Sequence, residues 1–314
     1  MDNQEKPSTL RCWWVACRVF AIPASAVPVI FGTVLAVSMA GAELDWLRFV
    51  LALLGMAVLH TAANLLNDAA DFKKGLDKRV NPVSGAVVRG WIEPRQALMA
   101  GWFLLASGIL IGLYLVWLVG WSLLFIGAAG ILLGVLYSLG PWPLKHYALG
   151  DLAVFSSCGL LGSLGAWTCQ TGQVSWLPVL WSVPIGLLIA AILHANNWRD
   201  IPSDVEGGIH TLANSLGDRA SVVYFAFLLF FPFVFVAAWV ALSWLDGLEP
   251  RMPWLALLSL LALPLAVSLM RRGMLRRAPA KPMDFLALDG AVAQLSLIFG
   301  LLYIAGIGLQ PLVG

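Results

Sequence analysis

The sequence carries very little charge. Only 11% of its 314 residues are Asp, Glu, Lys or Arg, whereas 60% are hydrophobic. A soluble domain has about 25% charged residues, so this composition excludes an ordinary soluble protein. It predicts an integral membrane protein that crosses the bilayer several times.

Cysteine and cleavage signals are also scarce. The four cysteines, Cys12, Cys17, Cys158 and Cys169, contain no C-x-x-C pair, and we interpret them as small apolar residues within helices. The first apolar run is too long for a signal peptide, and no A-x-A-like cleavage site stands out. We therefore expect this run to be a retained helix.

The sequence does contain long stretches without any charged residue. A transmembrane helix needs about 20 apolar residues. Five uncharged stretches suffice for one pass each: 19–42, 49–67, 220–245, 252–270 and 290–314. Two more suffice for two passes each, 96–144 with a break at Gly120 and 152–198 with a break at 170–173. The predicted fold class is all-α: a polytopic integral membrane protein of about nine transmembrane helices, in a single domain over 1–314.

The basic residues predict the orientation. With nine passes, sixteen of the nineteen Lys and Arg residues fall on one side, and only Arg48 and Arg251 on the other. The positive-inside rule then places the N-terminus in the cytoplasm and the C-terminus on the opposite side of the cell membrane. The long polar loops, about 68–96, 140–150 and 198–219, share the cytoplasmic side, so we expect the active site there.

Two acidic segments end two of the predicted helices. The first acidic segment, 60–77, reads HTAANLLNDAADFKKGLD, and the second acidic segment, 194–208, reads HANNWRDIPSDVEGG. Their spacing predicts that each aligns oxygen ligands along one helix face. The rows are Asn64, Asp68 and Asp71 in the first segment and Asn196, Asp200 and Asp204 in the second, with Asn67 and Asn197 beside them. The matched placement indicates two helix ends that face one cavity.

Acids aligned on one helix face repel each other, and the cost rises at a membrane. A divalent cation offsets it, and Mg²⁺ suits hard oxygen ligands that bridge to phosphate. Candidates for binding an anion are Lys73, Lys74, Lys145 and Arg199. The alternative to a metal site, for either acidic segment taken alone, is a solvated helix end without a ligand. His60 and His194 each fit a hydrogen-bonded packing role as well as a substrate contact.

Both segments resemble the aspartate-rich motifs of the UbiA superfamily of intramembrane prenyltransferases. The resemblance rests on NDAADFKKGLD (67–77) and NNWRDIPSDVEGGIHTLANSLG (196–217), and extends to NPVSGAVVRGWI (81–92). LYSLGPWPLKHYALGDLAVF (136–155) is similar to the Tyr-Pro-Lys loop of that superfamily. The resemblance to this superfamily implies a UbiA-like fold, in which the helices surround a central cavity.

One branch of the superfamily resembles this chain most. The commonest first motif has a third Asp where this chain has Gly75, and here the acid follows at Asp77. This D-F-x-K-G-x-D motif and the segment ALGDLAVF are similar to those of the 1,4-dihydroxy-2-naphthoate polyprenyltransferases of menaquinone biosynthesis. This similarity implies Mg²⁺-dependent transfer of a polyprenyl group from a polyprenyl diphosphate to that aromatic acceptor. Acceptors used elsewhere in the superfamily, 4-hydroxybenzoate, haem, chlorophyllide or a lipid, are the alternatives.

The resemblance also implies roles for individual residues. The metal ligands and catalytic residues would be Asp68, Asp71, Asp200 and Asp204. The diphosphate would be bound by Lys145, Arg199 and Lys73. Supporting residues would be Asn64, Asn67, Asn196, Asn197, Asp77 and Tyr137. The partners would be the two substrates and the lipid bilayer, with no nucleic acid and no obligatory protein partner.

An allylic cation is quenched by water, so such a site must be closed and apolar. We expect aromatic residues of the helices to form its walls, including Trp102, Tyr114, Phe125 and Tyr137. A rival hypothesis is an ion-coupled transporter, whose acids would lie near the bilayer midplane on broken helices. The acids here lie at helix ends beside basic loops. The acidic motif of CDP-alcohol lipid transferases is not found.

Overall fold

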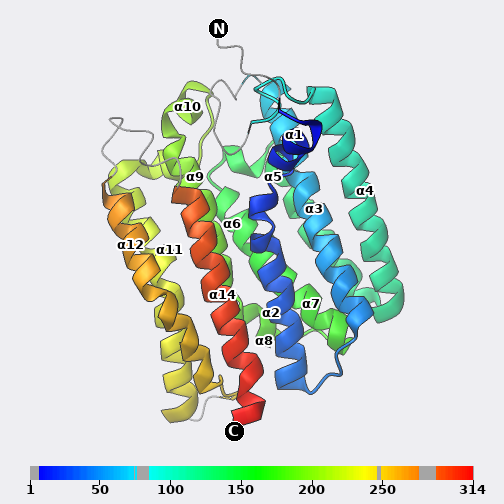
Figure 1. The fold of residues 1–314 in the computed structure, drawn as a ribbon, viewed down its shortest axis with the longest axis vertical. Helices are drawn as coiled ribbons and strands as arrows, with labels where there is room; N and C mark the ends of the chain where they lie inside the picture. The colour runs from blue at the N-terminus through cyan, green and yellow to red at the C-terminus, as the bar shows by residue number, and fades with distance from the viewer. Residues whose placement is uncertain (1–6, 74, 76–84, 246–248, 276–287, 314) are drawn as a thin grey trace.

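The structure is a computed structural model that describes residues 7–73, 75, 85–245, 249–275 and 288–313. The described chain is a helical bundle (Figure 1), and it contains one isolated β-bridge but no strand. The helices of the first half are α1 (Thr9–Ala16), η1 (Val19–Ala21), α2 (Pro23–Ala40), α3 (Trp46–Lys73), α4 (Pro94–Val119), α5 (Trp121–Ser138), η2 (Leu144–His146), α6 (Gly150–Val154) and η3 (Phe155–Leu161). Those of the second half are α7 (Gly162–Thr171), α8 (Trp176–Trp181), α9 (Val183–Arg199), α10 (Ile201–Glu206), α11 (Leu212–Leu245), η4 (Trp254–Ala262), α12 (Leu263–Met274) and α14 (Leu288–Val313).

The predicted membrane passes correspond to these helices. Within the described ranges, eight spans are long and apolar enough to cross a membrane. Both double passes divide as predicted: Gly120 separates α4 from α5, and α7 ends at Gly172 in a left-handed conformation. The remaining predicted pass is divided at Ser182 into α8 and a 17-residue α9. Eight long spans and this divided one account for the predicted total of about nine.

The two ends of the bundle differ in what they present. Helices α1 and α10 lie at one end, which we call the α10 end, and α14 finishes at the opposite end (Figure 1). The described helices thus begin and finish at opposite ends of the bundle, which is consistent with an odd number of passes. The opposite end holds the short connections from α2 to α3 and from α7 to α8.

Small residues let the central helices approach closely. A side chain at Gly32 of α2 would overlap the carbonyl oxygen of Ser163 in α7. A side chain at Gly306 of α14 would likewise overlap the backbone of Leu255. Close backbone approach at small residues is how helices associate in lipid, where apolar side chains gain little by leaving the solvent.

Aromatic rings fill the remaining central space. Phe31 of α2 stacks on Tyr303 of α14, with ring centroids 5.2 Å apart. The Tyr303 hydroxyl donates to the Trp181 carbonyl at 3.2 Å, so this buried polar group is satisfied. Buried residues of α2, α9, α11 and α14 pack around these rings as one hydrophobic core.

Candidate functional site

The first acidic segment is helical, as predicted. Helix α3 continues through Asn64, Asp68 and Asp71 and ends at Lys73, so its oxygen ligands share one helix. The Asp68 carboxylate is buried and accepts a hydrogen bond from Arg18 Nη2 at 2.6 Å. Arg18 stands in the left-handed region, with φ 48°, between α1 and η1. That conformation is unfavourable for a residue with a side chain, and here it accompanies an ion pair.

A lysine from a distant loop completes the first half of the site. Lys145 Nζ forms an ion pair with Asp71 and donates to Asn67 Oδ1 at 2.6 Å. Ser138, at the end of α5, donates to the same Asn67 oxygen at 2.6 Å. The loop that carries Lys145 is thereby tied to the acidic face of α3.

The second acidic segment departs from its predicted form. One continuous helix through Asn196, Asp200 and Asp204 was expected, but α9 ends at Arg199 and a separate helix, α10, begins at Ile201. The cause is Pro202, which donates no backbone hydrogen bond and whose ring collides with the preceding helical turn. The prediction of one helix face is therefore wrong for Asp204.

Arg199 organises the second half of the site. Its guanidinium makes two hydrogen bonds to Asp200, at 2.8 and 2.6 Å, and one to Asn196 at 2.8 Å. A further bond of 2.8 Å reaches Asp289 at the start of α14. The planar fork of arginine suits such bidentate pairing. Asp289 was not predicted, because it is a single acid far from both segments in the sequence.

Asp204 connects the two halves. Burial raises its pKa to about 7, and the negative charges of Asp200 and Asp71 add to that rise. Lys145 and a hydrogen bond with Thr211 act in the opposite direction. An electrostatic interaction between Asp204 and Asp71 requires that the two acidic segments lie near each other. The structure therefore brings together acids that are far apart in the sequence.

The loops around the site are also joined. The Ala148 amide donates to the His210 carbonyl at 2.7 Å, within a parallel bridge between Tyr147 and His210. The bridge holds the loop of Lys145 beside the loop that follows α10. Tyr137 lies beneath, within electrostatic range of Asp71 and Asp204.

The remaining predicted site residues make fewer contacts with the rest of the site. Lys73 is exposed at the end of α3, and neither Asn64 nor Asn197 makes a side-chain hydrogen bond within the described residues. Lys74 and Asp77 lie outside the described residues, as do positions 81–84 of the segment after the first motif. Arg18 and Ser138 were missed, because nothing in their local sequence connects them to an acid.

Three of the aromatic residues expected in the cavity walls lie elsewhere. Trp102, Tyr114 and Phe125 are 49%, 45% and 72% exposed on α4 and α5. On membrane-spanning helices, such exposure means contact with lipid, so the expectation is wrong for these three. A helix that is apolar all round gives no sequence signal for which face is buried.

The donor set around these acids fits Mg²⁺. Within the described part of the chain, no group of three or more Asp, Glu, His or Cys side chains forms a ready metal cage. Mg²⁺ needs no such cage, because it uses one or two carboxylates and completes its shell with waters and substrate phosphate. Buried Asp68 Oδ2 has no hydrogen-bond partner among the described residues, and Asp71 and Asp200 have only cations to balance their charge. Asp68 Oδ2 is thus free for a hard cation, whereas Lys145 and Arg199 would first have to leave Asp71 Oδ1 and both Asp200 oxygens.

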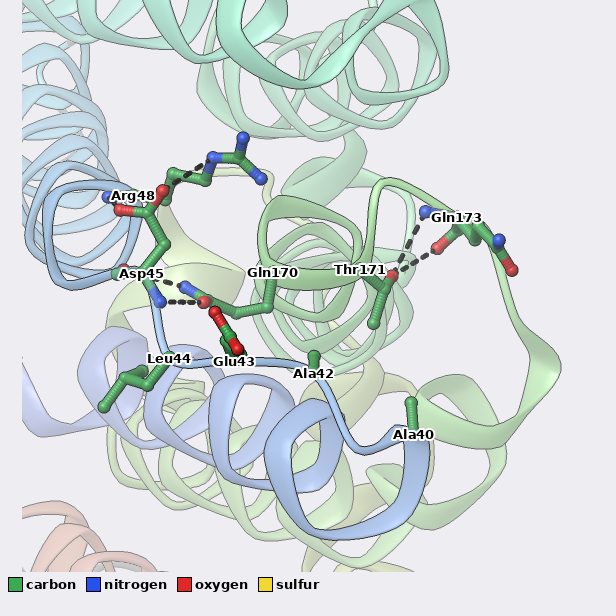
Figure 2. Close-up of a pocket in the computed structure, with 9 residues that line it drawn as sticks. All are labelled: Ala40, Ala42, Glu43, Leu44, Asp45, Arg48, Gln170, Thr171 and Gln173. Carbon is green, nitrogen blue, oxygen red and sulfur yellow. Dashed lines mark hydrogen bonds and ion pairs between the residues drawn. The ribbon is translucent and has the colours of Figure 1, made fainter.

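A pocket of about 570 Å³ lies at the opposite end of the bundle (Figure 2). Its polar groups hold the fold together. Gln170 exchanges two hydrogen bonds with the Asp45 backbone, at 2.8 and 3.2 Å, and Arg48 pairs with the Asp45 side chain at 3.0 Å. Gln170, Asp45 and Arg48 are thus paired with one another.

Comparison with known proteins agrees with this geometry. The model of the UbiA prenyltransferase family matches residues 25–306. The chain is 32% identical to a 1,4-dihydroxy-2-naphthoate octaprenyltransferase of Bacillus subtilis, over 96% of this chain and 94% of the relative. It is 33% identical to UbiA prenyltransferase domain-containing protein 1 of Xenopus tropicalis, over 95% of this chain and 81% of that protein.

The fold is also shared with solved structures. A UbiA homolog from Archaeoglobus fulgidus, bound to GPP and Mg²⁺, superposes with a TM-score of 0.61 over 94% of this chain and 99% of that one. Its sequence is 15% identical, so this likeness concerns the fold alone. Taken with the family match, the all-helical bundle and its paired acidic segments show that the chain is a prenyltransferase enzyme that belongs to the UbiA prenyltransferase family.

Proposed function

We propose that this prenyltransferase transfers a polyprenyl group from a polyprenyl diphosphate to 1,4-dihydroxy-2-naphthoate, with Mg²⁺ bound between its acidic segments. The observation that carries the proposal is the convergence of Asp71, Asp204 and Lys145 at one end of the bundle. Acids of both segments and a cation meet there, as a bridged diphosphate requires. The Bacillus subtilis relative bears the name of this activity, which favours the acceptor.

The residues divide into metal ligands and anion contacts. Mg²⁺ would be held by Asp68, Asp71, Asp200 and Asp204. The presence of GPP and Mg²⁺ in the Archaeoglobus fulgidus homolog supports a metal in this fold. When bound, the metal would neutralise the diphosphate and stabilise it as a leaving group. Lys145 and Arg199 would turn from their carboxylate partners to the phosphate oxygens, with Lys73 at the entrance. Asn64, Asn67, Asn196, Asn197, Asp77 and Tyr137 would support them.

Charge neutralisation drives the reaction. As the C–O bond of the donor breaks, negative charge accumulates on the diphosphate, and fixed cations nearby stabilise it. The allylic carbon becomes positive and is captured by the electron-rich ring of the acceptor. With the naphthoate acceptor, the ring carboxylate leaves as CO₂. The surrounding helices would exclude water from the cation.

The proposal includes the setting of the reaction. The chain forms a single domain over 1–314 in the cell membrane, with the N-terminus and the active site on the cytoplasmic side. The basic loops support this orientation, and the acids at the α10 end agree with it. Their position at helix ends argues against a transporter, whose ion site lies near the midplane.

The test is to incubate membranes that contain the protein with a polyprenyl diphosphate, Mg²⁺ and a panel of aromatic acceptors, and to identify the products by mass. The expected product is prenylated naphthoquinol that lacks the carboxylate. Membranes without the protein are the control. A product formed only from 4-hydroxybenzoate, a porphyrin or a lipid would assign another acceptor, and no product from any acceptor would refute the proposal.

A further inference from the structure

A second pair of buried polar groups lies beneath the acidic segments, and the proposed function does not use it. Asp151, near the start of α6, and His194, in α9, are 3% and 0% exposed. His194 Nδ1 and Asp151 Oδ2 are 3.3 Å apart. We call this the Asp151–His194 pair. Neither residue belongs to the metal or diphosphate ligands named above.

The hydrogen-bonding capacity of the pair is only partly used. Among the described residues, both carboxylate oxygens of Asp151 and both ring nitrogens of His194 are buried without a hydrogen bond of good geometry. The Tyr224 hydroxyl of α11 faces Asp151, and its ring meets the His194 ring edge-on, with centroids 4.8 Å apart. Buried polar atoms are nearly always hydrogen-bonded. Within the pair, His194 Nδ1 faces Asp151 Oδ2 and the Tyr224 hydroxyl lies against the carboxylate, so His194 Nε2 is the buried atom left to receive a polar group from a ligand.

The position of the pair indicates which part of the reaction it serves. Asp151 follows the loop of Lys145, and the adjacent Gly150 packs against Tyr137 and the Lys145 backbone. His194 precedes Asp200 by six residues of sequence, about 9 Å of helical rise. The pair therefore lies below the acidic segments, toward the bilayer. We place the acceptor ring beside it, because the ring must meet the allylic carbon of a donor whose diphosphate lies at the acidic segments.

We propose that the Asp151–His194 pair binds a ring hydroxyl of the aromatic acceptor and takes its proton during prenyl transfer. This inference rests on the proposed function. A carboxylate held against one nitrogen of an imidazole leaves the other nitrogen to accept a proton, an arrangement that recurs in unrelated enzymes. Removing the hydroxyl proton increases the electron density of the ring when it attacks the allylic cation.

Atoms and electrons are conserved in this transfer. The donor C–O bond breaks with its electron pair on the diphosphate, and a ring carbon supplies the pair for the new C–C bond. The hydroxyl proton moves to the pair, and the oxygen becomes a ring carbonyl. The substituent on that ring carbon then leaves without its bonding electrons, as CO₂ from a carboxylate or as a proton. The Asp151–His194 pair returns the hydroxyl proton, and the ring is aromatic again.

The experiment compares Asp151→Asn and His194→Gln with the unaltered enzyme. Both should keep Mg²⁺-dependent binding of the radiolabelled donor, while kcat for transfer falls about 100-fold or more. Asp218→Asn is the matched control, because Asp218 is an acid that accepts from Trp198 Nε1 outside the pair. The asparagine oxygen can still accept that bond, so the control should transfer normally.

Two comparisons separate proton transfer from packing. An acceptor with methylated hydroxyls has no proton to give, so the variants should then be as fast as the unaltered enzyme, whereas a packing defect slows both acceptors equally. If the methyl ether is not prenylated at all, the transfer rates of Asp151→Glu and Asp151→Asn distinguish the two roles. A proton acceptor predicts that Glu, which keeps the carboxylate, is faster than Asn, and a packing role predicts the reverse.

The outcomes of the two proposals are distinct. If the unaltered enzyme forms no prenylated aromatic product, the proposed function fails. If it forms product and Asp151→Asn has normal kcat, only the role of the pair is overturned. Loss of donor binding in both variants would also overturn it, because the pair would then support the diphosphate site.

Discussion

Arg18 Nη2 lies 2.6 Å from Asp68 Oδ1, and the Asp68 side chain is only 3% exposed. The arginine precedes the first membrane span, whereas the acid lies in the second. A buried carboxylate whose partner is removed is left uncompensated, at a cost of several kcal/mol. In the absence of metal, Arg18 therefore supplies the positive charge that compensates the buried Asp68 carboxylate within the bundle.

Arg18→Gln should destabilise the protein and make its stability depend on Mg²⁺. Because Arg18 is 21% exposed, we expect a loss of about 3 kcal/mol, the lower end for a broken buried pair. Thermal unfolding in detergent with and without Mg²⁺ measures this, and Mg²⁺ should raise the Tm of the variant more than that of the unaltered protein. An equal rise in both would show that Asp68 does not contact the metal.

Asp71→Asn and Asp200→Asn should each abolish prenyl transfer. Asparagine matches the shape of aspartate but carries no charge to hold a cation, so we expect at least a 100-fold fall in transfer without unfolding. Transfer by the unaltered enzyme should also stop in EDTA and return with Mg²⁺. Size-exclusion elution and thermal unfolding verify the fold, and normal turnover by both variants would refute the metal assignment.

Mg²⁺ binding should strengthen as the pH rises through about 7. The pKa of Asp204 is raised to about 7 from 3.8 by burial and by Asp200 and Asp71, so below pH 7 a proton competes with the metal. The same shift means that metal-free stability falls as pH rises from about 4 to about 7, since the folded state then holds more protons than the unfolded state. Calorimetric Mg²⁺ titrations from pH 6 to 8 test this, and Asp204→Asn should remove the pH dependence.

Asn67→Ala should impair transfer more than Asn64→Ala. Asn67 Oδ1 accepts from both Ser138 and Lys145, each at 2.6 Å, and thus positions the lysine beside Asp71. Losing these bonds costs on the order of 1–3 kcal/mol, or about tenfold or more in rate. Steady-state rates at saturating Mg²⁺ compare the two variants. If Asn64→Ala proves the more damaging, Asn64 rather than Asn67 supports the diphosphate site.

Several features of the fold follow from local sequence alone. The uncharged stretches predict the membrane passes because each must shield its own backbone from lipid, and Gly120 and Gly172 end helices where a conformation unfavourable to other residues is needed. The row through Asp68 and Asp71 was predictable because α3 runs unbroken. The break before α10 was also visible in Pro202, although the regular spacing of the acids pointed to a continuous helix.

Only the tertiary structure decided how these helices meet. Lipid and the bundle interior are both apolar, so the sequence does not distinguish the buried from the lipid-facing side of a span, and the outward positions of Trp102 and Phe125 were not foreseen. Polar partners were equally hidden, because Arg18, Asp151 and Asp289 acquire their roles from residues far away in the chain. The sequence by itself determined where the membrane passes run, about nine in all, and which acids they carry. The packing determined which cation stands beside each acid, and which buried pair lies beneath them.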